Sequence, residues 1–160
     1  MFHFFRKKQK NIIAPVAGQC VDITQVPDEA FSSGLMGDGI AVIPKGNVIC
    51  SPCDGTISMI FPTRHAFGVT MDDGTELLIH IGIDTVILNG VGFYTLKQEN
   101  AKVCAGDPII KFDSKYLEHS DMNMTTMVIL TNSGFAWQKR NLGNMVDTGD
   151  ILFEKAENLE

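Results

Sequence analysis

Two histidines, His65 and His80, lie in neighbouring strand-like runs of residues 63–86. Asp72-Asp73-Gly74 between the runs is typical of a turn, so the segment is predicted to form a β-hairpin. A histidine can act as a nucleophile and carry a phosphoryl group as a covalent intermediate. A second imidazole can hydrogen-bond to the oxygens of the transferring group and stabilise their charge. The pair therefore predicts phosphoryl transfer or metal binding, with two ordinary hydrogen-bonded histidines as the simpler interpretation.

The type of turn decides whether the two rings can meet. With Asp73 and Gly74 as a two-residue turn, Phe67 pairs with His80. His65 then lies diagonally opposite His80 on the same face, with backbones roughly 7–8 Å apart, which is within reach of two imidazoles. A four-residue loop would keep this pairing. A three-residue loop would shift it by one residue and place the histidines on opposite faces.

The charge of such a site can also be anticipated. Residues 82–86 are suitably placed to direct peptide N–H groups towards His80. Two imidazolium ions this close would repel, so at least one of the two pKa values is expected to lie low.

The composition is that of one soluble globular domain. The chain has 160 residues, of which 44% are apolar and 20% charged, and it can bury an adequate core. No apolar run approaches the roughly 18 residues that span a bilayer. The formal charge of −6 argues against nucleic-acid binding, which usually requires a basic surface. The start MFHFFRKKQKN lacks the apolar region of a signal peptide, so we expect a cytoplasmic protein.

Cys50-Ser51-Pro52-Cys53 has the spacing of redox-active cysteines. Such a motif needs a helix after its first cysteine to lower the pKa of the thiol, whereas DGTISMIF predicts a turn and a strand here. A zinc site would need two more ligands at matching spacing, and Cys20 and Cys104 stand alone. We therefore expect buried, reduced thiols.

Short repeated units indicate an all-β fold. Residues 14–18 (APVAG) resemble residues 51–55 (SPCDG), and residues 103–112 resemble residues 146–153, which indicates an internal duplication. Turn signals recur between runs rich in β-branched residues, such as IAVIP and ELLIHI. This spacing predicts an antiparallel β-sandwich or barrel-like single domain.

Only short helical turns are expected, at residues 28–31 and at residues 114–120, where Ser114 is the expected cap and Leu117 the packing residue. We assign residues 12–154 to the domain, residues 1–11 to a flexible tail and residues 155–160 to a frayed tail. The first tail combines phenylalanines with basic residues, a composition that could give weak membrane contact. A solvated tail is the simpler interpretation.

Longer stretches of the chain match a known family. They are APVAG, VPDEAFSSGLMGDGIAVIP, SPCDGTI, FPTRHAFGV, DGTELLIHIGIDTV, LNGVGF and AGDPIIKFD, and they extend over residues 12–153. Through them the sequence resembles the glucose-family enzyme IIA of the bacterial phosphoenolpyruvate-dependent sugar phosphotransferase system. The resemblance implies an antiparallel β-sandwich that accepts a phosphoryl group from the phosphorylated histidine-containing carrier protein. It also implies onward transfer to a cysteine of a sugar-specific enzyme IIB domain, with no metal or organic cofactor.

The resemblance assigns roles to five residues. His80 matches the histidine that is phosphorylated at Nε2, and His65 matches the second histidine, which supports the phosphoryl group. Thr63 matches a hydroxyl that orients the His65 ring, and Gly82 a carbonyl that holds the other nitrogen of His80. Asp84 matches an acidic neighbour of the site.

A shallow apolar rim is expected around the histidines, where partner proteins would dock. Its expected members, each of which could equally be a core residue, are Phe31, Leu35, Met36, Phe61, Leu78 and Val86. The sequence departs from the family at Met127, where relatives often have proline, and at Leu78, which replaces a common aromatic residue. We expect neither departure to touch the chemistry and both to affect the choice of partner.

Three alternative functions are compatible with parts of the sequence. A zinc peptidase of the lysostaphin-like group needs a late His-x-His pair, but the residue two after His80 is Gly82. A biotinyl or lipoyl carrier needs a lysine at the hairpin tip, and Asp72-Asp73-Gly74 contains none. A regulatory binding protein, which signals sugar supply through its phosphorylation state, would use the same apolar rim. A metal ion shared by His65, His80 and a partner's carboxylate is also compatible with the pair.

Overall fold

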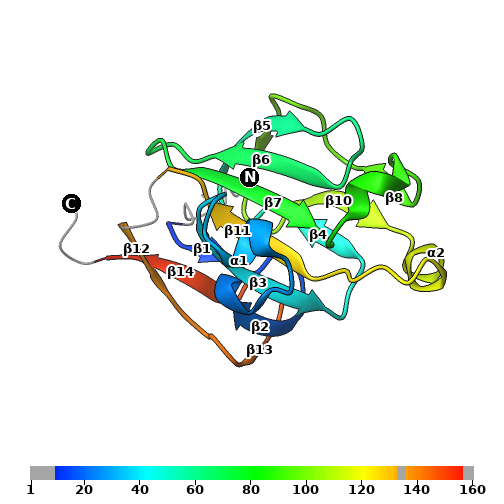
Figure 1. Ribbon diagram of the computed structural model, residues 1–160. Coiled ribbons are helices and arrows are strands. Elements are labelled where there is room, and N and C mark those ends of the chain that lie inside the picture. Colours follow the sequence, from blue (N-terminus) through cyan, green and yellow to red (C-terminus); the bar gives the residue numbers. More distant parts are fainter. Residues whose placement is uncertain (1–9, 133–135, 157–160) are drawn as a thin grey trace.

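The computed structural model describes residues 10–132 and 136–156, which form mainly antiparallel strands (Figure 1). The predicted all-β class with only short helical turns is confirmed. The strands are β1 (Ile12–Ile13), β2 (Gly18–Asp22), β3 (Asp38–Pro44), β4 (Val48–Cys50), β5 (Gly55–Ile60), β6 (Ala66–Thr70), β7 (Glu76–Ile81), β8 (Phe93–Thr95), β9 (Lys102–Val103), β10 (Pro108–Phe112), β11 (Thr126–Leu130), β12 (Trp137–Lys139), β13 (Met145–Val146) and β14 (Ile151–Lys155). The helices are α1 (Glu29–Ser32) and α2 (Ser114–His119), with 3₁₀ turns η1 (Ile23–Gln25) and η2 (Thr85–Leu88).

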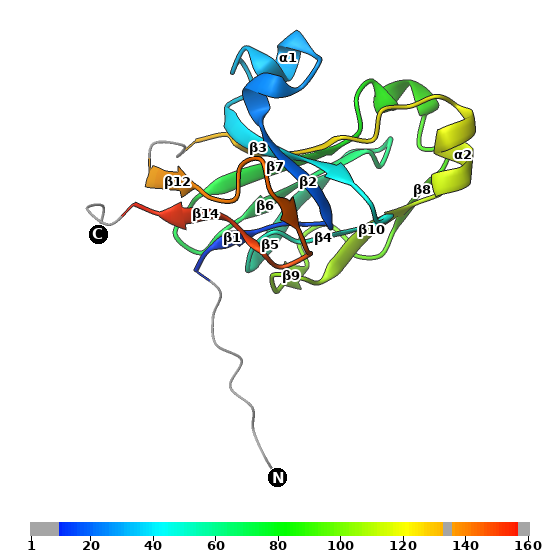
Figure 2. The same cartoon turned by 90° about the horizontal axis from the view of Figure 1, so that it is seen from below.

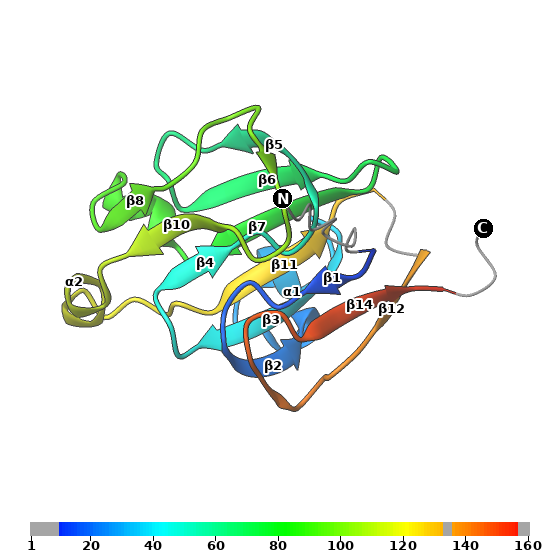
Figure 3. The ribbon, with the colours of Figure 1, turned by 180° about the vertical axis from the view of Figure 1, so that it is seen from behind.

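The strands form three sheets around one main core. The largest sheet has eight strands in the order β13-β2-β3-β11-β7-β6-β5-β9, and the two small sheets have the orders β1-β14-β12 and β4-β10-β8. Figure 3 shows β4, β10 and β1 in front of the large sheet. Buried side chains from all three sheets, such as Ile12, Ile49 and Ile79, meet in the main core. No sheet of the described chain closes on itself, so the architecture is a sandwich and not a barrel.

The predicted internal duplication is visible in single hydrogen bonds. The N–H of Ile13 donates to the carbonyl of Pro52 at 2.8 Å, and the N–H of Cys50 donates to the carbonyl of Pro15 at 2.9 Å. The two proline-containing repeats thus bind each other reciprocally. The strand order follows the same symmetry, because β7 and β11 lie at the centre of the large sheet and equivalent strands flank them.

The second pair of repeats forms matching turns. In each, an aspartate carboxylate accepts a hydrogen bond from the backbone N–H three residues earlier, Asp107 from Cys104 and Asp150 from Asp147, both at 2.8 Å. A charged acceptor for a turn N–H stabilises the turn more than a neutral one would. The duplication therefore includes the turn chemistry as well as the strands.

The large sheet is covered on both faces around β11. Alternate residues of β7 are buried, as expected for a strand with one partly solvated face, whereas all five residues of β11 are buried. Val128 and Leu130 belong to the main core, while Met127 and Ile129 belong to a second apolar cluster. The second cluster also contains, from the connection between β2 and β3, Ile23, Val26 and Phe31. Figure 2 shows that this connection, with α1, stands on the side of the sheet away from β1.

The helical turns occur where they were predicted, with one difference in capping. α1 begins after Asp28, whose side chain caps it. α2 begins after Asp113 and not after Ser114. The carboxylate of Asp113 accepts a hydrogen bond from the N–H of Tyr116 at 3.1 Å, because it reaches the free N–H groups of the first turn. Leu117 is buried in the main core, as predicted.

The predicted C-terminal tail contains one residue of the last strand. Lys155 is the final residue of β14 and lies opposite Trp137 of β12. Its ammonium group also lies 2.9 Å from the carboxylate of Asp73, so Lys155 is held at both its backbone and its side chain. Residues 1–9 and 157–160 of the two predicted tails lie outside the described residues. No helix in the part of the chain that the structure describes is long and apolar enough to cross a membrane.

Gly18 and Gly55 end the two proline-containing repeats and leave no room for a side chain. A Cβ at Gly18 or Gly55 would lie 2.0 or 2.3 Å, respectively, from a backbone carbonyl oxygen. Because backbone would have to move, we expect Gly18→Ala and Gly55→Ala each to lower the free energy of unfolding by about 1–3 kcal/mol in urea denaturation. Gly46→Ala is the control, since its methyl group would meet only the Val16 side chain at 3.3 Å. Equal losses in all three variants would contradict this explanation.

Candidate functional site

The hairpin that carries the histidines has a different register from the predicted one. Ala66 and not Phe67 lies opposite His80, so the strands are joined by a three-residue loop. The carboxylate of Asp73 accepts a hydrogen bond from the N–H of Thr75 at 2.9 Å, a side-chain bond that stabilises the longer loop. The predicted two-residue turn, and the pairing that followed from it, are wrong.

The two rings nevertheless meet, with centroids 4.8 Å apart and planes inclined at 78°. Strand alternation would place them on opposite faces in this register. His65, however, precedes β6 and follows Arg64, whose φ of 56° is left-handed. The guanidinium of Arg64 donates to the carbonyl of Gly90 at 2.9 Å and holds this bend. The carbonyl of His65 still accepts a hydrogen bond from the N–H of Ile81 at 2.7 Å, but regular strand geometry ends at the left-handed Arg64, and the His65 ring lies beside that of His80.

The tautomer of His80 is fixed by its neighbour two residues on. Nδ1 of His80 lies 2.9 Å from the carbonyl oxygen of Gly82. A carbonyl oxygen only accepts, so Nδ1 carries the proton and the lone pair of the neutral ring lies on Nε2. Gly82 has a φ of 80°, and a Cβ there would lie 2.4 Å from Cγ2 of Thr85. Only glycine fits this position, and the neutral His80 ring consequently has its free lone pair on Nε2.

His65 is held in its neutral form. Nδ1 of His65 lies 2.7 Å from the hydroxyl oxygen of Thr63, and the residue is only 2% exposed. Burial, followed by the neighbouring ring of His80, lowers the pKa of His65 to about 4. The expectation that at least one of the two pKa values lies low is confirmed. When the hydroxyl of Thr63 donates to Nδ1, the proton of His65 lies on Nε2 and can be donated to a third group.

The pKa of His80 is influenced by its burial, by one hydrogen bond and by two carboxylates. Burial lowers the pKa of His80 and is the largest influence, while the hydrogen bond to Gly82 and the charges of Asp28 and Asp84 act in the opposite direction. Asp84 was expected beside the site. Asp28 was not, because the local sequence identifies it only as a helix cap and gives no sign of its distance from His80.

Two phenylalanines extend the imidazole pair to a row of four rings. The ring centroid of Phe31 lies 4.9 Å from that of His80, and the ring centroid of Phe61 lies 5.4 Å from that of His65. Phe31 is only 4% exposed and belongs to the second apolar cluster. It is therefore a core contact of His80, which is the second of the two roles that the sequence left open for it.

The other expected rim residues differ in exposure. The exposed ones are Leu35, Met36 and Val86, and the half-buried ones are Phe61 and Leu78. Ile87, next to Val86 in η2, is 73% exposed and was missing from the predicted rim. A single apolar residue in a short turn gives no periodic signal by which it could have been found.

Met127, one of the two departures from the family pattern, lies directly opposite His80 on β11 and is fully buried. It belongs to the same cluster as Phe31. Its side chain is therefore not accessible to a partner, and an effect of Met127 on the choice of partner stays a prediction.

The described residues around the two histidines do not form a complete set of metal ligands. Within residues 10–132 and 136–156 no group of three or more His, Cys, Asp or Glu side chains could hold a metal ion. Catalytic zinc sites use three protein ligands and an open position, so the zinc-peptidase alternative lacks its ligand set here. A metal ion bound by His65 and His80 would need a further ligand from another molecule.

Three of the four cysteines are buried thiols of low reactivity. All four are free, and Cys20, Cys50 and Cys53 are buried. Burial raises the pKa of each of these three thiols, that of Cys20 to about 11. Thiols of this kind stay protonated at physiological pH, so the interpretation as buried, reduced thiols is confirmed for these three.

Known proteins resemble this chain in sequence and in fold. The sequence model of the family "phosphoenolpyruvate-dependent sugar phosphotransferase system, EIIA 1" matches residues 10–135. The PTS system glucose-specific EIIA component of Buchnera aphidicola subsp. Baizongia pistaciae is 41% identical over 159 residues, which cover 94% of this chain and 95% of the relative. The PTS system glucoside-specific EIICBA component of Staphylococcus carnosus is 48% identical over 126 residues, which cover 78% of this chain but only 18% of that longer protein. The solved structure of glucose permease IIA from Mycoplasma capricolum has a TM-score of 0.81 at 33% identity, with 95% of this chain and 98% of that one covered.

The chain therefore belongs to the EIIA 1 family of the phosphoenolpyruvate-dependent sugar phosphotransferase system. Within this system it is a glucose-family EIIA component. Such a component is a phosphotransferase that carries phosphoryl groups in sugar uptake, and the resemblance drawn from the sequence is confirmed.

Because His65 is buried in its neutral form, the stability of the protein should depend on pH. Between the ordinary pKa of 6.5 and the folded value of about 4, the unfolded chain binds a proton that the folded protein does not. We expect the free energy of unfolding to fall as the pH is lowered through this window, and this part of the fall to be absent from His65→Gln. Urea denaturation across the window measures both proteins. An identical pH dependence in the two proteins would contradict the assignment.

Proposed function

We propose that His80 accepts a phosphoryl group on Nε2 from a phosphorylated donor protein and passes it on to an acceptor. The observation that carries this assignment is the 2.9 Å hydrogen bond from Nδ1 of His80 to the carbonyl of Gly82, which leaves the lone pair on Nε2. A nitrogen nucleophile must be unprotonated, and burial lowers the pKa of His80 and thereby favours the neutral ring.

The transfer step needs one nucleophile and one stabilising donor. The Nε2 lone pair of His80 forms a bond to phosphorus while the bond between phosphorus and the donor's nitrogen breaks. The three oxygens of the phosphoryl group carry the charge of the transition state. We assign their stabilisation to Nε2–H of His65, whose Nδ1 is held by Thr63 at 2.7 Å. In onward transfer the bond from Nε2 to phosphorus breaks, and an acceptor sulfur forms the new bond.

The relatives suggest the partners. The relative from Staphylococcus carnosus is an EIICBA component, so in that protein EIIA is joined to EIIB and EIIC. By analogy, this chain passes its phosphoryl group to a cysteine of a sugar-specific enzyme IIB in the cytoplasm, after receiving it from the histidine-containing carrier protein. The exposed side chains of Leu35, Met36 and Val86 would contact both partners. The carboxylates of Asp28 and Asp84 would favour a basic partner surface.

His80→Ala is expected to abolish phosphorylation, because the variant lacks the nucleophile. Incubation with phosphoenolpyruvate, enzyme I and the histidine-containing carrier protein, followed by intact mass and peptide mapping, measures the gain of one acid-labile phosphoryl group. His119→Ala is the matched control, since His119 is an exposed histidine of α2 and its loss should leave labelling complete. Full labelling of His80→Ala would contradict the assignment. So would a lack of labelling of the unaltered protein when the partner proteins are active.

His65→Gln is expected to accept the phosphoryl group but to pass it on about 100-fold more slowly, because the flexible amide does not place its N–H where Nε2–H of the imidazole ring lies. A single-turnover chase of the phosphorylated variant with enzyme IIB measures the rate. Thr63→Val should slow the same step by a smaller factor, since it frees the His65 ring without removing it. Onward transfer at the normal rate in His65→Gln would remove His65 from the mechanism.

A further inference from the structure

The Phe31 ring, which covers His80, is carried by a long connection outside the strands. This connection, residues 23–37, leaves the large sheet after β2 and returns to it at β3, and we call it the cap segment. The ladder between β2 and β3 ends at Asp22 and Ile40, and the ladder between β3 and β11 ends at Asp38 and Leu130. Both flanking residues are thus held in the large sheet, but neither ladder extends into the cap segment. Other contacts must therefore fix where the cap segment lies.

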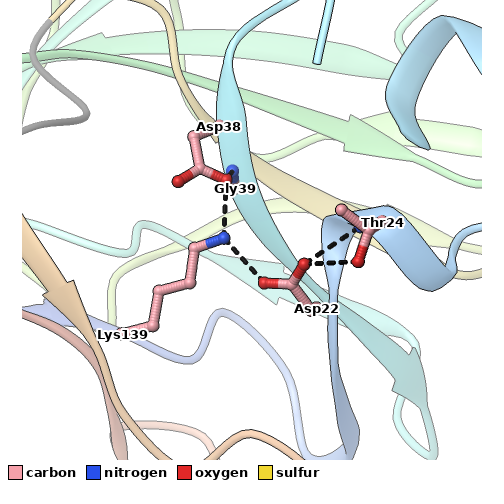
Figure 4. A network of polar contacts seen from close by, with 5 residues as sticks. All are labelled: Asp22, Thr24, Asp38, Gly39 and Lys139. Atoms are coloured by element: carbon pink, nitrogen blue, oxygen red, sulfur yellow. Dashed lines mark hydrogen bonds and ion pairs between the residues drawn. The ribbon is translucent and has the colours of Figure 1, made fainter. Parts of the chain in front are cut away.

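A lysine from a different sheet closes the base of the cap segment (Figure 4). Nζ of Lys139 lies 2.6 Å from Oδ1 of Asp22 and 2.5 Å from Oδ1 of Asp38. Asp22 is the last residue before the cap segment, and Asp38 is the first residue after it. Because Lys139 belongs to β12 of a small sheet, the two ion pairs also tie that sheet to the large one.

The pair with Asp22 is partly buried, the pair with Asp38 is more exposed, and both carboxylates have further partners. The side chains of Lys139 and Asp22 are only 20% and 24% exposed, whereas that of Asp38 is 55% exposed. Oδ2 of Asp22 accepts hydrogen bonds from the hydroxyl and the N–H of Thr24 at 2.6 and 3.2 Å, and Oδ1 of Asp38 accepts one from the N–H of Gly39 at 2.8 Å. Burial alone would lower the pKa of Lys139, but its two carboxylate partners raise it above the usual value. The ammonium group therefore stays charged, and salt screens these pairs less than it screens fully exposed ones.

The far side of the cap segment is held by apolar contacts at the site. Ile23, Val26 and Phe31 are buried with Met127 in the second cluster. The Phe31 ring lies 4.9 Å from the ring of His80. The cap segment is thus held by ion pairs at its two ends, next to Lys139, and by apolar packing at the site.

We propose that Lys139 is a positioning residue for phosphoryl transfer, although it lies outside the histidine site. By pairing with Asp22 and Asp38 it fixes the base of the cap segment. The fixed cap segment holds Phe31 against the His80 ring and so keeps Nε2 aimed at the incoming phosphorus. This role rests on the proposed function of His80.

Lys139→Gln removes the charge of the side chain, keeps a polar end and shortens the side chain by one bond. We expect weaker nuclear Overhauser effects between the ring protons of Phe31 and His80 in this variant. We also expect the rate of His80 phosphorylation at saturating donor to fall about 10-fold, because reacting atoms that are displaced by less than an ångström lose much of their alignment. The donor concentration for half-maximal rate should not change. Lys139→Arg, which keeps the charge, should restore both measurements.

Arg140→Gln is the matched control. Arg140 is the next residue along the chain and pairs with Glu154 at 2.8 Å. Its guanidinium also donates to the backbone carbonyl of Lys139 at 3.2 Å, so this variant removes a neighbouring charge that contacts the backbone of Lys139 and leaves the ammonium group of Lys139 in place. The loss of Arg140 should change neither the Overhauser effects nor the rate. If Lys139→Gln fails to fold, Asp38→Asn tests the same clamp by removing one of its two ion pairs.

Several results would overturn the role of Lys139. One is a lower melting temperature of Lys139→Gln with unchanged Overhauser effects and rate, which would make the residue purely structural. Another is a change confined to the half-saturating donor concentration, which would make the cap segment a docking element. A third is a failure of Lys139→Arg to restore the rate. If the unaltered protein is not phosphorylated on His80, the proposed function fails, while the Overhauser comparison still tests the clamp.

Discussion

The hydrogen bond from Nδ1 of His80 to the carbonyl of Gly82 is the interaction on which the proposed chemistry depends. It places the proton on one ring nitrogen and the lone pair on the other. Several neighbouring residues hold the two partners of this hydrogen bond in place. Gly82 adopts a left-handed conformation in which a side chain would collide with Thr85, and the hydroxyl of Thr85 in turn donates to the carbonyl of Ile81 at 2.5 Å. The histidine and its acceptor are thereby held on one rigid turn at the end of β7.

The duplicated scaffold explains why two rings can converge on this turn. β7 and β11 lie at the centre of the large sheet, and the connection between β2 and β3 is the counterpart of the connection between β5 and β6. The first connection, the cap segment, brings Phe31 to His80, and the second brings His65 with its neighbour Phe61. The site itself is not duplicated, because β11 carries no histidine. The duplicated strands thus form the scaffold, and the two connections, which differ from each other, bring the rings to the site.

Much of this could be predicted from the sequence, because the signals are local. The repeated proline and aspartate turns predicted the duplication, and the spacing of turns predicted the all-β class. Thr63, His65, His80 and Gly82 were identified by their match to the family, and the structure brings them together as two hydrogen-bonded pairs. The remaining errors concern geometry that no short stretch of sequence specifies.

The hairpin register was mispredicted because the side chain of Asp73 stabilises a longer loop. The bend at Arg64 then restores the contact that the true register would have prevented. For Phe31 the sequence left a rim position and a core position equally open, since its burial depends on β11, far away in the chain. The pairing of Lys139 with Asp22 and Asp38 is of the same long-range kind and has no sequence signature.

The most direct test of the central claim is to identify the nitrogen that carries the phosphoryl group. Nitrogen NMR of the phosphorylated protein, labelled with ¹⁵N at histidine, distinguishes the two ring positions through their shifts and their couplings to phosphorus. The hydrogen bond to Gly82 predicts a phosphoryl group on Nε2 of His80, with the proton retained on Nδ1. A phosphoryl group on Nδ1 of His80, or on His65, would contradict the account.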